Sequence, residues 1–278
     1  MNMRFMIENE VANSQMRFIL LKVQKEKNIK GGRTMKVKGK RFFYLIGFFL
    51  QLLISSNSFS DVICKWEFNG NAQDSNGKYN GELKGDPTYV DDRSGNKNSA
   101  LYLKKGQSVD FSNSETFSFT DGTKDKPFTI AWWQKSEVPE GQNGLPETVF
   151  SVIAKTAEYS VSWSKAFRLW LNDGKEAYDG KSAGILLCFK KWTQIVVTYD
   201  GSGSSSGIQL YQDGKACPSQ KESSTPPATY KCMKRTYSPL VLGGLYEGAI
   251  DDLVIYDKAL SSQEIKDLYE SSLPKSSK

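Results

Sequence analysis

The strongest constraint on the fold is a succession of short alternating segments separated by turn-forming residues. Runs such as 127–134 and 192–199 are rich in β-branched and aromatic side chains, and turn signals such as Asp213-Gly214 recur about every 8–12 residues. One stretch reads as a helix, because Ser261 and Glu264 form a capping box before apolar residues at helical spacing. The pattern predicts an all-β chain: a two-sheet antiparallel β-sandwich or jelly roll with one short C-terminal helix.

The N-terminal part of the chain has the layout of an export signal. Residues 36–41 are basic, an apolar run of 13 residues covers 42–54, and small polar residues follow up to Ser60. This order of regions predicts a secretory signal peptide over residues 35–60. The alternative is an uncleaved membrane anchor, for which the run is short of the roughly 20 residues that span a bilayer.

The predicted signal divides the chain. Residues 1–34 are interpreted as an upstream extension, with Met35 as the true first residue, and residues 61–278 as a single domain. We expect a secreted, periplasmic or cell-surface protein with no stable membrane span after cleavage of the signal.

The charge follows the same division. Of 37 Lys and Arg residues and 31 Asp and Glu residues, residues 1–60 hold 11 basic and 3 acidic ones. The remaining chain has 26 basic and 28 acidic residues, a net charge of −2. The basicity therefore belongs to the leader, and we expect no nucleic acid as a partner.

The four cysteines all follow the leader. An even number in an exported protein suggests disulfides. Cys217 and Cys232 flank a polar, proline-containing segment and are the predicted local pair, which leaves Cys64 and Cys188 as the second pair. The alternative is that two or more of them are free buried thiols.

Histidine is absent from the whole chain. Its absence excludes every histidine-dependent catalytic triad and every histidine-ligated catalytic zinc. Phosphate-binding glycine loops and nucleophile elbows are also missing from the sequence.

Two adjacent aspartates stand in the stretch 248–261, which reads as a central strand with apolar residues on both faces. In an extended strand Asp251 shares a face with Leu253 and Ile255, and Asp252 falls on the other face. A carboxylate among aliphatic side chains is costly unless it is compensated. A metal ion, backbone N–H groups or a solvated strand end would each compensate it.

Several segments occur together in the order typical of one family. They are Trp66-Glu67-Phe68-Asn69-Gly70 with Asp74-Ser75-Asn76-Gly77, Ala100-Leu101-Tyr102-Leu103, residues 127–133, residues 192–201, residues 210–214, and residues 250–256 continuing to Glu264-Ile265. This ordered set resembles the laminin-G-like jelly-roll family of the concanavalin A-like lectin/glucanase superfamily, over essentially all of residues 64–272. The resemblance implies two antiparallel sheets packed face to face, with the first and last strands side by side.

Many members of that family hold a structural Ca²⁺ near those two strands. The resemblance therefore implies that Asp251 faces a calcium ion whose other ligands come from the turn 69–77, with Asp74 as the side-chain ligand. Calcium prefers carboxylate and carbonyl oxygens, which are abundant in this turn. The alternative is that Asp74 caps the turn and Asp251 accepts hydrogen bonds from its backbone.

The resemblance points to a binding domain rather than an enzyme. Glucanases of the superfamily carry Glu-x-Asp-x-x-Glu on one strand, and this spacing is absent from the sequence. A pairing among Glu158, Glu176 and Asp179, in the part that matches the family least, would be needed for a glycan-active hydrolase.

The expected ligand is a carbohydrate, for which an exposed aromatic ring is the usual platform. Trp163, Trp170 and Tyr178 are the candidate ligand-binding residues, and Trp170 alternates against the apolar Phe167, Leu169 and Leu171. The alternative for both tryptophans is burial, which is common for this residue. A protein–protein or cell-surface adhesion module, with an extracellular protein as its partner, is the second hypothesis.

Overall fold

The computed structural model describes residues 62–112, 115–137, 150–163, 166–174, 178–183, 190–223 and 230–274. The predicted upstream extension and signal peptide lie outside these residues and stay predictions. In the described part of the chain, no helix has the length and apolar content needed to cross a membrane.

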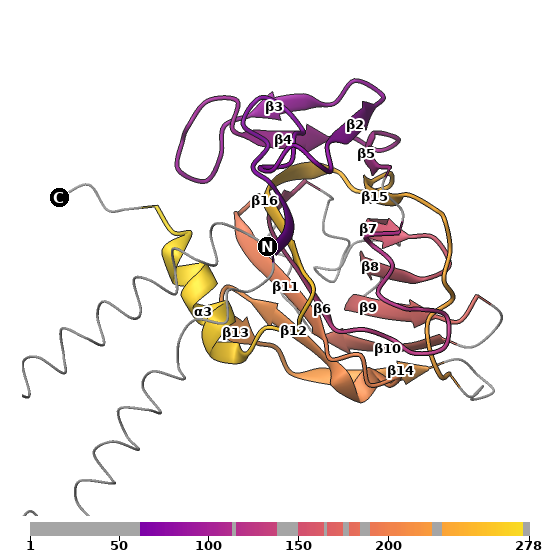
Figure 1. The fold of residues 1–278 in the computed structure, drawn as a ribbon. Helices are drawn as coiled ribbons and strands as arrows, with labels where there is room; N and C mark the ends of the chain where they lie inside the picture. Colours follow the sequence, from indigo (N-terminus) through magenta and orange to yellow (C-terminus); the bar gives the residue numbers. More distant parts are fainter. Residues whose placement is uncertain are drawn as a thin grey trace, which may run out of the picture. The chain divides into compact units, whose positions relative to one another are not determined.

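Two antiparallel sheets face one another and form a sandwich (Figure 1). The first sheet, sheet A, contains in spatial order β13 (Lys215–Ala216), β12 (Ile208–Gln212), β11 (Thr193–Tyr199), β6 (Phe128–Ser136), β16 (Gly248–Tyr256), β4 (Ala100–Leu103) and β3 (Thr88–Val90), with β1 (Val62–Trp66) also paired to β16. The second, sheet B, contains β14 (Ser219–Ser223), β10 (Tyr178–Ala183), β9 (Phe167–Asn172), β8 (Tyr159–Trp163), β7 (Phe150–Lys155), β15 (Leu240–Gly243), β5 (Ser108–Phe111) and β2 (Gly81–Lys84). The predicted all-β sandwich is confirmed.

The core lies between the two sheets and is rich in aromatic side chains. Trp132 of β6 and Phe167 of β9 meet across the sandwich with ring centroids 5.9 Å apart. The ring centroids of Trp66 in β1 and Phe111 in β5 also meet across the sandwich, 4.0 Å apart. All four side chains are at most 1% exposed. The inward-facing residues of both sheets thus bury a continuous apolar layer, as expected of aligned sheets.

The C-terminal helix α3 (Ser262–Ser271) begins as the sequence predicts. Ser261 accepts a hydrogen bond from the Glu264 backbone, and the Glu264 carboxylate accepts one from the Ser261 backbone. Ile265 of this helix joins a second apolar cluster on the outer face of sheet A. The other members are Ala131, Val196, Tyr211, Val254, Tyr256 and Leu260.

Strand β16 occupies the centre of sheet A. It pairs with β6 on one side and with β4 and β1 on the other. The first and last strands are therefore adjacent, as the family resemblance implied.

Several strands lie where the sequence analysis did not place them. Strand β2 follows the turn 69–77, and β14 lies in the polar segment between Cys217 and Cys232. Both are edge strands of sheet B and carry mostly exposed polar side chains, so they lack the apolar alternation that identifies an interior strand.

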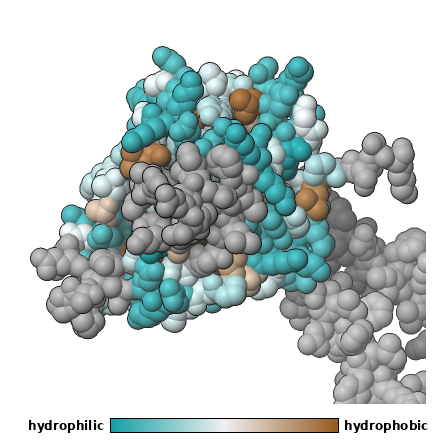
Figure 2. All heavy atoms as spheres, turned by 180° about the vertical axis from the view of Figure 1, so that it is seen from behind, coloured by the Kyte–Doolittle hydropathy of each residue, from teal (hydrophilic) through white to brown (hydrophobic). Residues whose placement is uncertain are grey.

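The visible surface is mostly hydrophilic. On the face shown in Figure 2, hydrophobic residues form separate small patches. Among the described residues, the large hydrophobic side chains with substantial exposure are Val62, Leu83, Tyr237, Leu245 and Leu273.

Candidate functional site

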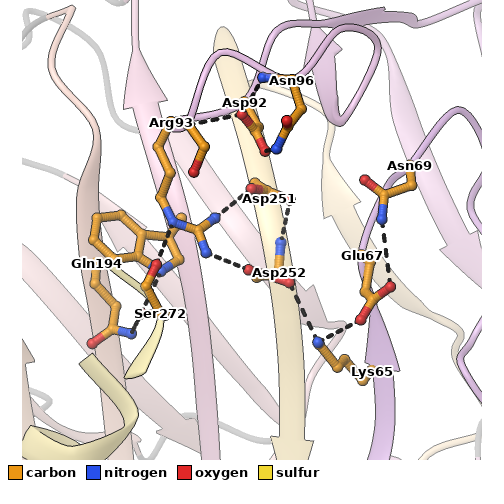
Figure 3. A network of polar contacts seen from close by, with 12 residues as sticks. Lys65, Glu67, Asn69, Asp92, Arg93, Asn96, Gln194, Asp251, Asp252 and Ser272 are labelled. Carbon is orange, nitrogen blue, oxygen red and sulfur yellow. Dashed lines mark hydrogen bonds and ion pairs between the residues drawn. The ribbon is translucent and has the colours of Figure 1, made fainter. Parts of the chain in front are cut away.

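The two adjacent aspartates of β16 bind one guanidinium group (Figure 3). Arg93, in the loop between β3 and β4, places Nη1 2.5 Å from Asp251 Oδ2 and Nη2 2.7 Å from Asp252 Oδ2. Lys65 Nζ lies 3.6 Å from the other oxygen of Asp252. The charge that compensates Asp251 is thus an arginine side chain.

This arrangement corrects the predicted strand parity. A bulge interrupts the pairing of β16 with β6 between Asp251 and Val254, and Asp252 adopts a left-handed backbone with φ of 47°. The extra residue resets the alternation, because a bulge shifts every later side chain to the other face. Asp251 consequently lies on the outer face of the sheet with Val254, while Leu253 and Ile255 face the core.

Arg93 also joins the end of α3 to the sheet. Its Nε donates to the Ser272 carbonyl at 3.0 Å, and its guanidinium lies 4.7 Å from the Trp133 ring centroid. Trp133 in turn stacks on Tyr269 of the helix. A pocket of about 470 Å³ beside this network is lined by Lys65, Asp92, Asn96, Gln194 and Pro274, among others. Its charged groups are largely paired with one another.

Burial and the neighbouring Asp252 raise the pKa of Asp251 to about 7, although Arg93 and the backbone N–H of Asp252 act in the opposite direction. The carboxyl group is only 3% exposed, so loss of hydration is the main cause of the shift.

The described residues do not fit a calcium site shared by Asp74 and Asp251. Asp74 accepts hydrogen bonds from the backbone of Lys65 at 2.9 Å and of Lys78 at 3.3 Å, so it caps its turn. Asp251 already faces Arg93. In this part of the chain, no cluster of three or more acidic or cysteine side chains could hold a metal ion. These contacts give the calcium expectation no support, and removal of divalent ions is its test.

The predicted Cys217–Cys232 disulfide is absent from the structure, in which Cys64, Cys217 and Cys232 are free thiols. Cys217 Sγ lies 3.8 Å from the Lys215 carbonyl, and Cys232 Sγ lies 3.5 Å from that of Gly122. The two thiols therefore contact different segments, Cys217 the strand β13 and Cys232 the loop that contains Gly122. Cys64 is fully buried in the core. Its predicted partner, Cys188, lies outside the described residues.

The three candidate ligand-binding aromatics have different positions. Trp163 is fully buried and packs edge-on against Phe167 at 5.2 Å, so its ring is not available as a platform. This corrects the prediction for Trp163: its position on β8 alternates inward into the core. Tyr178 begins β10, and its side chain is not among those described. Trp170 alone fits the expectation, because it alternates outward along β9 and is half-buried.

The ring of Trp170, on the outer face of sheet B, reaches over the neighbouring strand β10. Trp170 is paired with Gly180 of this strand, and a Cβ atom on Gly180 would stand 2.5 Å from Cε3 of the indole. The absence of a side chain at residue 180 is therefore what lets the ring lie over the strand. The Arg168 guanidinium, held by Glu222 at 2.8 Å, lies 5.8 Å from the same ring.

A pocket of about 300 Å³ adjoins this tryptophan. Trp170 and Ala154 form its apolar part. Its polar part comes from the turn between β7 and β8 and from the end of β9. Its lining residues are Ala154, Lys155, Thr156, Ala157, Glu158, Tyr159, Ser160, Trp170 and Asn172. An aromatic wall with a few hydroxyl and amide groups is the usual composition of a small-ligand site.

The carboxylates near this pocket already have partners. Glu158 is fully buried and accepts hydrogen bonds from Ser118 and Thr236 while it pairs with Lys155 at 3.1 Å. Asp179 accepts hydrogen bonds from the backbone of Gly180 and Ser205. Glu176, the third residue of the possible hydrolytic set, lies outside the described residues.

Sequence reasoning missed both Arg93 and Gly180. Arg93 lies in a loop that carries no motif, so its contact with β16 depends on the tertiary fold. Gly180 offered a usable signal, since a glycine inside a strand often marks the close approach of another group.

A family model described as "Concanavalin A-like lectin/glucanases superfamily" matches residues 103–266, more than half of the chain. No curated protein sequence matches significantly. Among solved structures, domain 4 of AbnA, a GH43 extracellular arabinanase from Geobacillus stearothermophilus in complex with arabinotriose, is 20% identical with a TM-score of 0.51. The match covers 75% of this chain and 98% of that domain.

Two toxin domains are similar to the same extent. The binding domain of Paraclostridial Mosquitocidal Protein 1 is 17% identical with a TM-score of 0.57, over 76% of this chain. The binding domain of botulinum neurotoxin serotype D is 17% identical with a TM-score of 0.54, over 78% of this chain. The chain spans about half the length of each toxin domain (52% and 53%). These likenesses establish the sandwich fold, and the family match over residues 103–266 shows that the chain belongs to the concanavalin A-like lectin/glucanase superfamily.

Proposed function

We propose that this chain is an exported, non-catalytic binding domain that takes a carbohydrate on the outer face of sheet B. The observation that carries the proposal is the indole of Trp170, which lies over Gly180 beside a pocket with hydroxyl and amide groups. An aromatic ring on a sheet surface can stack on the C–H side of a sugar, and neighbouring polar groups bond its hydroxyls.

The carboxylates support a binding role rather than hydrolysis. A glycosidase needs two carboxyl groups on either side of the scissile bond. Of the described residues, Glu158 is the acidic residue that lines the pocket, and its oxygens are occupied by Ser118, Thr236 and Lys155. It is therefore poorly placed to act as a general acid or a nucleophile.

The neighbouring folds support two ligand classes. The arabinanase domain was solved with arabinotriose, which favours a glycan. One botulinum neurotoxin binding domain was solved with rat synaptotagmin II, which keeps an extracellular protein as the second candidate. The small pocket, with hydroxyl and amide groups beside one aromatic ring, favours the glycan.

A glycan array with the purified protein tests the proposal. We expect defined glycan hits that are lost in Trp170→Ala and retained in Leu245→Ala, a matched change at an exposed apolar residue elsewhere. An array without hits, or hits that Trp170→Ala does not affect, would count against the site. Binding to extracellular proteins without glycan hits would favour the adhesion module instead.

A further inference from the structure

We infer that Tyr237 is a second aromatic contact of this glycan site, held at its rim by the buried ion pair of Lys155 and Glu158, and that the ligand is therefore an oligosaccharide of several units. The inference rests on the proposed function and deepens it.

Tyr237 is unusually exposed. Its side chain is 77% accessible, compared with 52% for Leu245, the next most exposed large hydrophobic residue in the described part of the chain. A single exposed apolar residue is ordinary on a protein surface. Tyr237 differs because the residues on both sides of it are fixed.

Lys155 and Glu158 fix those two neighbours. Lys155 Nζ donates to the carbonyls of Ser238 at 2.7 Å and of Thr236 at 3.2 Å. Glu158 Oε1 accepts from the Thr236 backbone at 2.6 Å and from its hydroxyl at 2.9 Å. The backbone on either side of Tyr237 is thus anchored to two side chains that are themselves fully buried.

Stability alone gives little reason for such a pair. Taking two charges out of water is costly, and well-packed apolar residues often replace a buried ion pair without loss of stability. Hydrogen bonds from this pair fix the backbone conformation of the segment 236–238. Apolar packing is not directional and would not fix it in this way. An exposed ring on a fixed backbone loses little conformational entropy when it binds a ligand.

The same segment borders the pocket that contains Trp170. The Thr236 hydroxyl oxygen lies 3.3 Å from the Thr156 carbonyl oxygen, and the Lys234 backbone donates to the Asn172 carbonyl at 2.9 Å. Thr156 and Asn172 both line the pocket. One aromatic residue therefore lies on the sheet and the other on the rim segment. A single sugar unit contacts one of them, whereas a chain of units reaches both.

A size series of oligosaccharides tests the inference. The probes are arabinose and glucose oligomers of one to six units, titrated by calorimetry against the wild type, Tyr237→Ala, Tyr237→Phe and Leu245→Ala. We expect Tyr237→Ala to weaken binding of oligomers of three or more units by about 2- to 10-fold, the usual range for one aromatic contact. Binding of the shortest probes is unchanged, and Tyr237→Phe and Leu245→Ala behave as the wild type.

The role of the ion pair has its own readout. The double variant Lys155→Met with Glu158→Leu removes both side chains that anchor the segment, whereas Thr236→Val removes the hydroxyl contact with Glu158 and keeps the backbone bonds. We expect faster trypsin cleavage at Lys234 and Arg235 of the folded protein, mapped by mass spectrometry, and the same length-dependent loss of affinity as in Tyr237→Ala, with smaller effects in Thr236→Val. Thr236→Val keeps the test valid if the double variant does not fold.

The outcomes separate this inference from the proposed function. If Trp170→Ala abolishes binding and Tyr237→Ala binds every length as the wild type does, the glycan site stands and the role of Tyr237 is wrong. Unchanged cleavage in the folded double variant overturns the anchoring, and unchanged cleavage in Thr236→Val overturns the part assigned to the hydroxyl. If the wild type binds no glycan on the array and no probe of either series, the proposed function and this inference fail together.

Discussion

Gly180 of β10 lies directly opposite Trp170 of β9, and the indole occupies the space that a side chain on residue 180 would need. A Cβ there would stand 2.5 Å from the ring and 2.8 Å from the Leu169 carbonyl. We therefore expect Gly180→Ala to displace Trp170 and to weaken glycan binding about as much as Trp170→Ala. Overpacking of this kind also costs about 1–3 kcal/mol of stability.

Gly106→Ala is the matched control for that loss of stability. Gly106 has a φ of 89° and no atom near its missing side chain, so alanine strains the backbone without touching Trp170. Equal binding losses in the two glycine variants would show that Gly180→Ala acts through stability rather than through the ring. Affinity by calorimetry and melting temperature by circular dichroism decide between them.

The buried carboxyl of Asp251 predicts a pH dependence of stability. Its pKa is raised from 3.8 to about 7, so between these values the folded protein holds a proton that the unfolded chain releases. The free energy of unfolding must then fall as the pH rises, by up to about 1.4 kcal/mol per pH unit from this group. We expect Asp251→Asn to remove this contribution, measured by urea unfolding from pH 4 to pH 7.

Asp257→Asn, at an exposed position just after β16, is the control for the pH experiment. We expect Asp257→Asn to show the same dependence of the free energy of unfolding on pH as the wild type. If Asp251→Asn also keeps the wild-type pH dependence, Arg93 keeps the Asp251 carboxylate ionised from pH 4 to pH 7.

Removal of divalent ions tests the calcium expectation. Because Arg93 supplies the positive charge at Asp251 and backbone N–H groups occupy Asp74, we expect millimolar EDTA to leave the melting temperature unchanged. A decrease of the melting temperature in EDTA that added Ca²⁺ reverses, and that Asp74→Asn does not show, would support a calcium site at Asp74 and Asp251.

Alkylation of the native protein tests the thiols. We expect iodoacetamide to label Cys217 and Cys232 without prior reduction, because both are partly accessible. Cys64 should react only after denaturation, since burial leaves it inaccessible and raises the pKa of its thiol. A peptide that contains Cys217 linked to Cys232 in the non-reduced digest would instead establish the disulfide that their spacing suggests.

The fold was predictable because its interior strands carry a strong compositional signal. The segments 127–134 and 192–199 are rich in β-branched and aromatic side chains and form β6 and β11, and the capping box at Ser261 marked the start of α3. The edge strand β2 was missed, since a four-residue polar segment at a sheet edge contains little that distinguishes it from a turn.

The site was less predictable, because its geometry depends on local departures from regular strands and on distant partners. Alternation along β9 correctly predicted that Trp170 faces outward. The same rule failed at Asp251, since the bulge at Asp252 cannot be read from alternation alone. The contacts of Arg93 and the anchoring of Thr236 join residues far apart in the sequence, which no local pattern encodes.

The central position of β16 determines when sheet A can close. Its partners β1, β4 and β6 are all synthesised more than a hundred residues earlier, yet among the described strands none of the three pairs with another, and β16 pairs with each of them. A nascent chain that ends before residue 248 therefore has an open, incompletely paired sheet. We expect folding to be slow, as is usual for chains dominated by long-range strand pairing, and to finish only after synthesis of this strand.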